Sequence, residues 1–589
     1  MYRLPFVLLS AFLLINAAAQ AAGVCPLLGP VYPAPKQFSN NTTFDAAAQK
    51  ISNKLDEAIR SAFGSQNPVF DANATSLALQ IFSVEDSTPL LQYYYTSTLT
   101  QTATTGVRVV DENTVFRIGS VTKLLTVFLF LIEKGNVLFH EPVIKYVPEL
   151  REAADDLRRN GIEKEVRIDY VCWEEVTIGE LASQLSGISR QYALGDLSLG
   201  TSKLVSVGFS QLPEADIPPC GPPLSPCDRT QFFHGLLRRH PVVPSASTPI
   251  YSNAAFQILA YALEEMIGKS FPELLQRDLI DALGLTRSST GKPADEYGII
   301  PFNATTSLWS LDIREEIPAG GIYSSLKDMS TVGRAILNST LLPLSLTRQW
   351  LKPASHTSYL SYSVGAPWEI YSFTEPRMID LYTKAGQIGL YSSMLAVSPD
   401  HDVGFAILAA GPGAAEVTTM VSDIIATTTV PALEQVAKEE AHKRFSGTYS
   451  LTNGSDFSVT ITVDGGPGLK VMQWINKSHN MSEAIKAAYG LTESTDVSIR
   501  LYPTGLQTSK KISFRSVIPS LIQGSSQGIG PFTRSCRTWM AVDGMVYGSV
   551  GVDEFVFEID HRGRATAVSP RAMRVSLPRL LSESSMKGN

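Results

Sequence analysis

Ser120 and Lys123 stand one helical turn apart in the segment FRIGSVTKLLTVFLFLIEKG, residues 116–135. Residues three apart share one face of a helix, so this hydroxyl and this amine are neighbours. The run that follows, LLTVFLFLI, is apolar on every face and predicts a buried helix. Burial lowers the pKa of a lysine, and a neutral lysine can accept the proton of a serine. The pair therefore predicts a serine nucleophile with a lysine base.

Two other interpretations fit this segment when it is read alone. A serine that caps a helix, beside a lysine that reaches out to solvent, gives the same spacing. A membrane span is the other alternative, but the apolar run has roughly half the length that a bilayer requires. The spacing itself is weak evidence, because the chain holds three more Ser-x-x-Lys pairs: Ser289/Lys292, Ser324/Lys327 and Ser584/Lys587.

Two downstream segments offer the other groups that a Ser–Lys nucleophile needs, namely a proton donor, a polar anchor for the lysine and an oxyanion donor. Tyr251 and Asn253 lie where a loop enters the predicted helix NAAFQILAYALEEMIG. Lys384 and Gly386 lie at the front of a predicted strand. Free backbone N–H groups at the start of the helix that carries Ser120 can also stabilise an oxyanion.

The ordered motifs Ser-x-x-Lys, Tyr-x-Asn and Lys-x-Gly resemble the serine β-lactamase and penicillin-binding-protein superfamily. With a tyrosine in the second motif, the chain resembles the branch that contains class C β-lactamases, DD-carboxypeptidases and esterases. It is also similar to secreted fungal β-lactamase-like proteins. The resemblance implies an α/β (α+β) β-lactamase/transpeptidase-like fold, with an antiparallel sheet flanked by a helical subdomain. We expect this catalytic domain over residues 22–435, with residues 190–250 as an insertion or lid.

The resemblance also implies residue roles. Ser120 attacks a carbonyl to form an acyl-enzyme, Lys123 and Tyr251 share the proton, and Tyr251 passes it to the leaving group. The oxyanion hole is formed by the backbone N–H groups of Ser120 and of the residue after Gly386. Neither a metal nor a cofactor is needed. The residues expected to bind substrate or to support the catalytic groups are Asn253, Lys384, Gly386 and Gln387.

Three residues depart from the family pattern. Ala385 replaces the hydroxyl residue that β-lactamases often place near the substrate carboxylate, Gln387 stands where Ser, Thr or Gly is usual, and Gln184 stands where His is frequent. The departures weaken the case for penicillin, so an ester, lactone, amide or β-lactam all remain as substrates of a serine hydrolase. The alternatives are an acyltransferase or lactone-forming enzyme of secondary metabolism, and a non-catalytic binding protein that keeps the fold.

The pattern of apolar and polar residues changes near residue 440. Short alternating runs separated by glycine-rich turns predict a separate all-β domain over residues 440–589, a lipocalin-like barrel or a sandwich. Within it, GSSQG at residues 524–528 fits the Gly-x-Ser-x-Gly nucleophile motif. That motif requires a helix after the serine, whereas Pro531 and the neighbouring glycines predict a loop.

Export is predicted by several features. Residues 1–21 have the charged start, apolar core and small-residue end of a secretory signal peptide. Of the five cysteines, Cys220 and Cys227 flank a proline-rich loop and are the preferred disulfide, and Cys25 with Cys536 is a second candidate pair. Eight sequons predict glycosylation, at Asn40, Asn41, Asn73, Asn303, Asn338, Asn453, Asn476 and Asn480.

The composition and charge of the chain limit the kinds of partner that we expect. The chain is 44% apolar and 18% charged, which is typical of a globular protein with a sizeable core. Its net charge is −7, and no cluster of Lys and Arg resembles a nucleic-acid footprint. We therefore expect a secreted, extracellular protein whose partner is a small-molecule or peptide acyl substrate, with neither nucleic acid nor membrane as a partner of the mature form.

Overall fold

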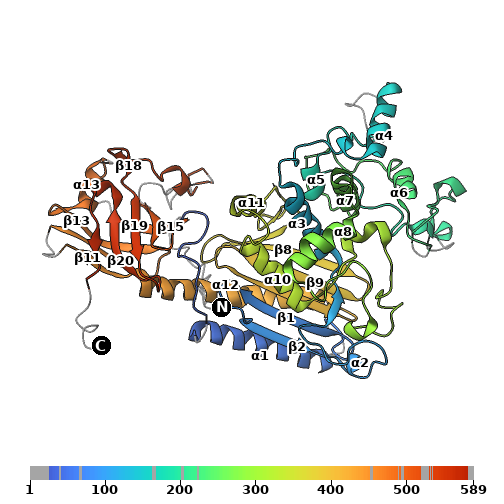
Figure 1. Ribbon diagram of the computed structural model, residues 1–589, viewed down its shortest axis with the longest axis horizontal. Coiled ribbons are helices and arrows are strands. Elements are labelled where there is room, and N and C mark those ends of the chain that lie inside the picture. Colours follow the sequence, from blue (N-terminus) through green and yellow to red (C-terminus); the bar gives the residue numbers. More distant parts are fainter. Residues whose placement is uncertain are drawn as a thin grey trace, which may run out of the picture. The chain divides into compact units, whose positions relative to one another are not determined.

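The computed structural model divides the chain into two compact units (Figure 1). One unit is Lys36–Ala432, and the other joins the described residues up to Pro35 with those from Leu433 onward. The structure describes residues 26–38, 41–64, 69–161, 168–199, 204–221, 224–451, 456–488, 490–492, 497–518, 529–530, 532–533 and 535–580. The predicted signal peptide, Cys25, Asn40, Asn453 and the 524–528 motif lie outside these residues.

The larger unit is built on an eight-stranded sheet with the order β2-β1-β10-β9-β8-β7-β6-β5. Every neighbouring pair in it is antiparallel. Its strands are β1 (Ser76–Ser83), β2 (Leu91–Tyr95), β5 (Ser355–His356), β6 (Tyr362–Val364), β7 (Glu369–Phe373), β8 (Ile379–Ile388), β9 (Tyr391–Ser398) and β10 (Val403–Ala410). The central strands β1, β9 and β10 are buried along their whole length, which requires cover on both faces.

Helices supply that cover. Figure 1 shows α1 (Thr42–Gly64) and α12 (Ala414–Phe445) side by side along one face of the sheet, and α10 (Leu326–Leu337) on the other. On the α10 face, a Cβ built on Gly333 comes within 2.3 Å of the Phe82 ring. Glycine therefore lets α10 lie close against β1.

A group of helices stands beyond the α10 face and holds the apolar segment after Ser120. Its members are α3 (Thr122–Lys134), α4 (Pro148–Arg159), α5 (Ile178–Ala182), α6 (Arg229–Leu236), α7 (Ala254–Ile267), α8 (Phe271–Leu275) and α9 (Ile317–Gly320). In α3 every residue from 122 to 131 is buried, because its neighbours surround it. The helix ends at Lys134, and Gly135 after it has a φ of 64°, which suits glycine.

The smaller unit is a nearly closed barrel. Its main path runs β11-β12-β13-β15-β16-β19-β20-β21, and the two ends meet where Leu580 N donates to Thr448 O at 2.8 Å. The strands are β11 (Gly447–Ser450), β12 (Phe457–Thr462), β13 (Leu469–Asn476), β15 (Ile499–Gln507), β16 (Lys511–Val517), β19 (Glu554–Ile559), β20 (Ala565–Pro570) and β21 (Leu577–Pro578). The predicted fold class, a β-lactamase/transpeptidase-like domain followed by an all-β barrel, is confirmed.

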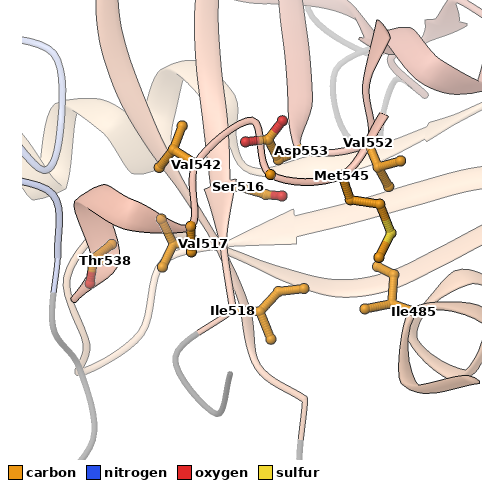
Figure 2. Close-up of a pocket in the computed structure, with 11 residues that line it drawn as sticks. Ile485, Ser516, Val517, Ile518, Thr538, Val542, Met545, Val552 and Asp553 are labelled. Carbon is orange, nitrogen blue, oxygen red and sulfur yellow. The ribbon is translucent and has the colours of Figure 1, made fainter. Parts of the chain in front are cut away.

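A pocket opens in this barrel unit beside β16 and α13 (Met481–Ala488), as Figure 2 shows. Most of its lining is apolar, and the labelled polar residues are Ser516, Thr538 and Asp553. No residue that the sequence nominated for catalysis or substrate binding lines it.

Cys220 and Cys227 form a disulfide with a Cα–Cα distance of 4.9 Å, as predicted. It lies in the segment 190–250, whose described part consists of loops, short 3-10 turns and α6. Among the described sequons, the exposed asparagines are Asn73, Asn303, Asn338 and Asn480. Asn41 and Asn476 are half-buried. Their glycosylation stays a prediction. Across the described ranges, no helix has the length and apolarity to cross a membrane.

Candidate active site

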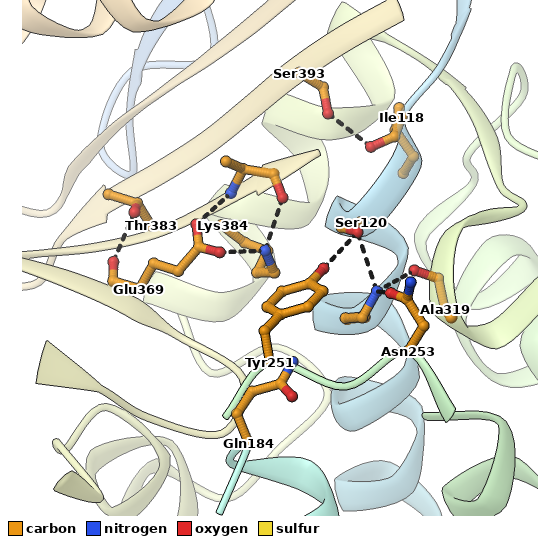
Figure 3. A network of polar contacts seen from close by, with 12 residues as sticks. Ile118, Ser120, Gln184, Tyr251, Asn253, Ala319, Glu369, Thr383, Lys384 and Ser393 are labelled. Atoms are coloured by element: carbon orange, nitrogen blue, oxygen red, sulfur yellow. Dashed lines mark hydrogen bonds and ion pairs between the residues drawn. The ribbon is translucent and has the colours of Figure 1, made fainter. Parts of the chain in front are cut away.

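Ser120 lies in a tight turn between a strand and a buried helix. The short strand β3 (Val115–Arg117) leads into the 3-10 turn η1 (Gly119–Val121), and α3 follows at once. Two groups from other parts of the site donate hydrogen bonds to Ser120 Oγ (Figure 3). Tyr251 Oη lies at 2.6 Å and Lys123 Nζ at 3.0 Å. The hydroxyl is therefore held between a phenol and an amine, as a nucleophile and its proton acceptors must be.

Lys123 is fully buried, at 0% exposure. Its amine donates to Ser120 Oγ, to Asn253 Oδ1 at 2.8 Å and to the Ala319 carbonyl at 2.6 Å. Burial lowers the pKa of Lys123 to about 8, even though Tyr251 acts in the opposite direction. A substantial fraction of this lysine is thus neutral near pH 7–8 and able to accept a proton.

Tyr251 sits on a loop that Gln184 holds in place. Gln184 Oε1 accepts from Ser252 N at 2.7 Å, and its carbonyl accepts from Ile250 N at 2.8 Å. Burial on its own would raise the pKa of the Tyr251 phenol, but the charges of Lys123 and Lys384 outweigh it and the pKa lies below its ordinary value. The phenol is therefore suited to carry a proton between Ser120 and a leaving group.

Lys384 comes from β8 and lies on the side of Tyr251 away from Ser120 (Figure 3). Its amine donates to Glu369 Oε1 at 2.5 Å and to the Ala385 carbonyl at 2.7 Å, and Glu369 Oε2 accepts from Ala385 N at 2.8 Å. Burial would lower the pKa of Lys384, but the Glu369 carboxylate and Tyr251 together outweigh it, and the pKa lies above its ordinary value. Lys384 therefore stays charged, 5.5 Å from the centre of the Tyr251 ring.

Gly386 brings β8 against the turn that carries Ser120. A Cβ at this position would lie 2.0 Å from the Ile118 carbonyl and 2.8 Å from Val121 N, so only glycine fits. The Gln387 backbone is equally close, because a Cβ on Gly119 would lie 2.6 Å from Gln387 N. The two segments expected to supply oxyanion N–H groups thus touch each other, as an oxyanion hole between Ser120 N and Gln387 N requires.

The structure brings all seven nominated residues into one site: Ser120, Lys123, Tyr251, Asn253, Lys384, Gly386 and Gln387. Sequence reasoning missed Glu369 and the Ala319 carbonyl, which hold the two lysines. Glu369 carries a charge opposite to that of Lys384 and lies on the strand before β8, which was the only hint of their contact in the sequence. The register between these two strands could not be predicted from the sequence. In the described part of the chain, no three His, Cys, Asp or Glu side chains are grouped so as to hold a metal ion.

The sequence profile described as "Beta-lactamase" matches residues 85–428, more than half of the 589 residues. The chain belongs to the β-lactamase family. A second profile, described as "Beta-lactamase-like-like, C-terminal domain", matches residues 437–580.

Similar proteins include fungal relatives of comparable length. The "Beta-lactamase-like protein" of Arthroderma benhamiae is 28% identical, over 95% of this chain and 96% of that protein. The "Probable hydrolase M10" of Phoma sp. is 23% identical, over 98% of this chain and 94% of that protein. A solved structure titled "A class C beta-lactamase" superposes with a TM-score of 0.46 and 17% identity, over 66% of this chain and 98% of that one. The profile match over more than half of the chain is what places it in the β-lactamase-like hydrolase family.

Proposed function

We propose that the protein is a secreted serine hydrolase that acts through an acyl-enzyme on Ser120, with an ester, lactone, amide or β-lactam as substrate. The observation that carries the proposal is the pair of hydrogen bonds to Ser120 Oγ, from Tyr251 at 2.6 Å and from Lys123 at 3.0 Å. Both partners have pKa values below their ordinary values, as is typical of groups that transfer protons in an active site.

In acylation, neutral Lys123 accepts the proton of Ser120 as Oγ attacks the substrate carbonyl. The developing oxyanion receives hydrogen bonds from Ser120 N and Gln387 N. Tyr251 Oη gives its proton to the leaving group and regains one from Lys123, which leaves the acyl group on Ser120. In deacylation water takes the place of the leaving group, and the same two side chains move its proton in reverse.

Two supporting residues keep this machinery in register. Asn253 Oδ1 fixes the Lys123 amine, and its own Nδ2 donates to Gln191 Oε1 at 2.8 Å. Lys384 keeps a positive charge beside Tyr251, which favours the phenolate. The relative named "Probable hydrolase M10" supports hydrolysis rather than a non-catalytic binding role.

Labelling with a fluorophosphonate probe tests the proposal directly. We expect one adduct, which mass mapping locates on Ser120 and which disappears in Ser120→Ala. The control is Ser324→Ala, which removes the serine of another Ser-x-x-Lys pair and leaves labelling intact. An adduct on Ser526, or no adduct with either a fluorophosphonate or a penicillin probe, overturns the assignment.

A further inference from the structure

Lys384 lies 5.5 Å from the ring centre of the proton carrier Tyr251, and its ammonium forms an ion pair with Glu369. Its side chain is 2% exposed, and the Glu369 carboxylate that pairs with it is 18% exposed. Because Glu369 also accepts from Ala385 N, both of its oxygens are used and its position is fixed. The pair has no net charge, and the carboxylate is its more exposed member.

The residue after Lys384 is the second part of the argument. Ala385 has no hydroxyl with which to bind a substrate oxygen. Gln387, the next exposed side chain of this strand, is neutral. The β8 side of the site thus offers neither a free ammonium nor a hydroxyl to a carboxylate. Two further cations approach Tyr251. Lys123 is fully buried and already donates three hydrogen bonds. The guanidinium of Arg190 lies 4.8 Å from the ring centre but is exposed, and an ion pair with an exposed side chain contributes little to binding.

We infer that Glu369 is a specificity-determining residue: it withdraws Lys384 from the substrate, so that the enzyme takes acyl substrates whose leaving group is neutral and disfavours those whose leaving group carries a carboxylate. The inference rests on the proposed function of Ser120. It concerns the leaving group because that group receives the proton of Tyr251 and so departs beside Lys384. An uncharged ester or lactone fits this chemistry, and a penicillin, with its carboxylate, does not.

The experiment compares two acetate esters that differ by one charge, 4-nitrophenyl acetate and 3-carboxy-4-nitrophenyl acetate. The wild-type protein should show the higher kcat/KM with the neutral ester. Glu369→Gln keeps the shape of the side chain but frees the ammonium charge, and should shift the neutral-to-anionic ratio toward the anionic ester by about tenfold, as one unscreened charge at this range allows. Glu369→Asp restores the carboxylate and should return the ratio toward that of the wild type.

The matched control is Glu149→Gln, which breaks the ion pair of Glu149 with Arg229 on α4 and α6 and should leave the ratio unchanged. An unchanged ratio in Glu369→Gln, or a wild-type preference for the anionic ester, overturns the inference while the Ser120 mechanism stands. Failure of both esters with the wild-type protein, at the level of Ser120→Ala, instead overturns the proposed function.

Removing one partner of a buried ion pair is costly, so Glu369→Gln can fail to fold. A measurement on the wild-type protein covers that case. Inhibition by phenol and by 3-hydroxybenzoate, which correspond to a neutral and to a carboxylated leaving group, reports the same charge preference without a substitution. We expect phenol to bind more tightly, and tighter binding of 3-hydroxybenzoate overturns the inference.

Discussion

Ser120–Lys123 and Ser324–Lys327 have the same spacing and the same position at the start of a helix, but only one of them lies in a site. Ser324 is in the short strand β4 (Tyr323–Ser325), directly before α10. Its Oγ is 2.8 Å from Ser288 Oγ, so its partner is another hydroxyl. Lys327 is exposed to solvent, whereas Lys123 is fully buried.

The difference shows that a Ser-x-x-Lys pair becomes reactive only when other segments of the chain place polar groups around it. Ser120 receives Tyr251 from a loop 131 residues away, and Lys123 receives Asn253 and the Ala319 carbonyl. These groups enclose the lysine in protein and lower its pKa. At the second pair, Ser324 Oγ meets the Ser288 hydroxyl, which donates to Asp328, and the Lys327 side chain is exposed and makes no comparable buried contact with Ser324.

Loss of the nucleophile should give the largest contrast. Ser120→Ala removes the atom that forms the acyl-enzyme, so kcat/KM for 4-nitrophenyl acetate should fall by at least about 10⁴-fold, in line with the loss of a catalytic serine elsewhere. Ser324→Ala should stay within about twofold, as expected of a serine outside a catalytic unit. Equal losses in the two variants, measured at equal thermal stability, would show that our choice of pair is wrong.

Loss of the lysine comes next. Lys123→Met keeps the length and apolar stem of the side chain but removes the base, and we expect kcat/KM to fall about 10³-fold, within the range of general acid–base catalysis. Lys327→Met alters an exposed side chain and should change kcat/KM by less than about twofold. Thermal unfolding of both variants separates lost chemistry from lost folding. Full activity in folded Lys123→Met would assign the proton transfer to another group.

Much of this site could be predicted from the sequence, because its parts are local. The helix after Ser120, the loop–helix junction at Tyr251 and the β8–β9 region each have a clear periodicity, and the order of the motifs identified the fold. Glu369 could not be predicted in the same way. It meets Lys384 only because β7 and β8 pair with Glu369 opposite Thr383, and no local pattern fixes that register.

The Ala319 carbonyl shows a second limit of sequence reasoning. A backbone oxygen has no residue identity, so no residue type marks it as the partner of Lys123. The segment around it, IPAGGIYSS, has no charged side chain that would indicate a contact with a lysine. The closure of the barrel from β11 to β21 is likewise a long-range pairing. Local structure could thus be predicted from the sequence, whereas contacts between segments far apart in the chain became known only from the structure.

Removal of the partner hydroxyl at each pair should give a smaller contrast. Tyr251→Phe deletes the phenol that donates to Ser120 Oγ at 2.6 Å, and the leaving group then departs without its proton donor. We expect kcat/KM to fall about 10²-fold, with the larger loss for substrates that have poor leaving groups. Ser288→Ala, at the other pair, should lower stability by about 1 kcal/mol through lost hydrogen bonds but leave kcat/KM unchanged. The same loss for good and poor leaving groups would contradict the proposed role of Tyr251.

The pH profile should give the smallest effect. Lys123 accepts a proton only when neutral, and its pKa is about 8, so kcat/KM should rise through an apparent pKa near 8 and fall about tenfold for each unit below it. Lys327→Met should leave this profile unchanged, since that side chain is exposed. Tyr251 raises the pKa of Lys123, so Tyr251→Phe should move the midpoint to lower pH even as it lowers the maximum. A profile that is flat from pH 6 to 9, or a midpoint that moves to higher pH in Tyr251→Phe, would mean that Lys123 is not the base. The two Ser-x-x-Lys pairs would then differ in burial but not in chemistry.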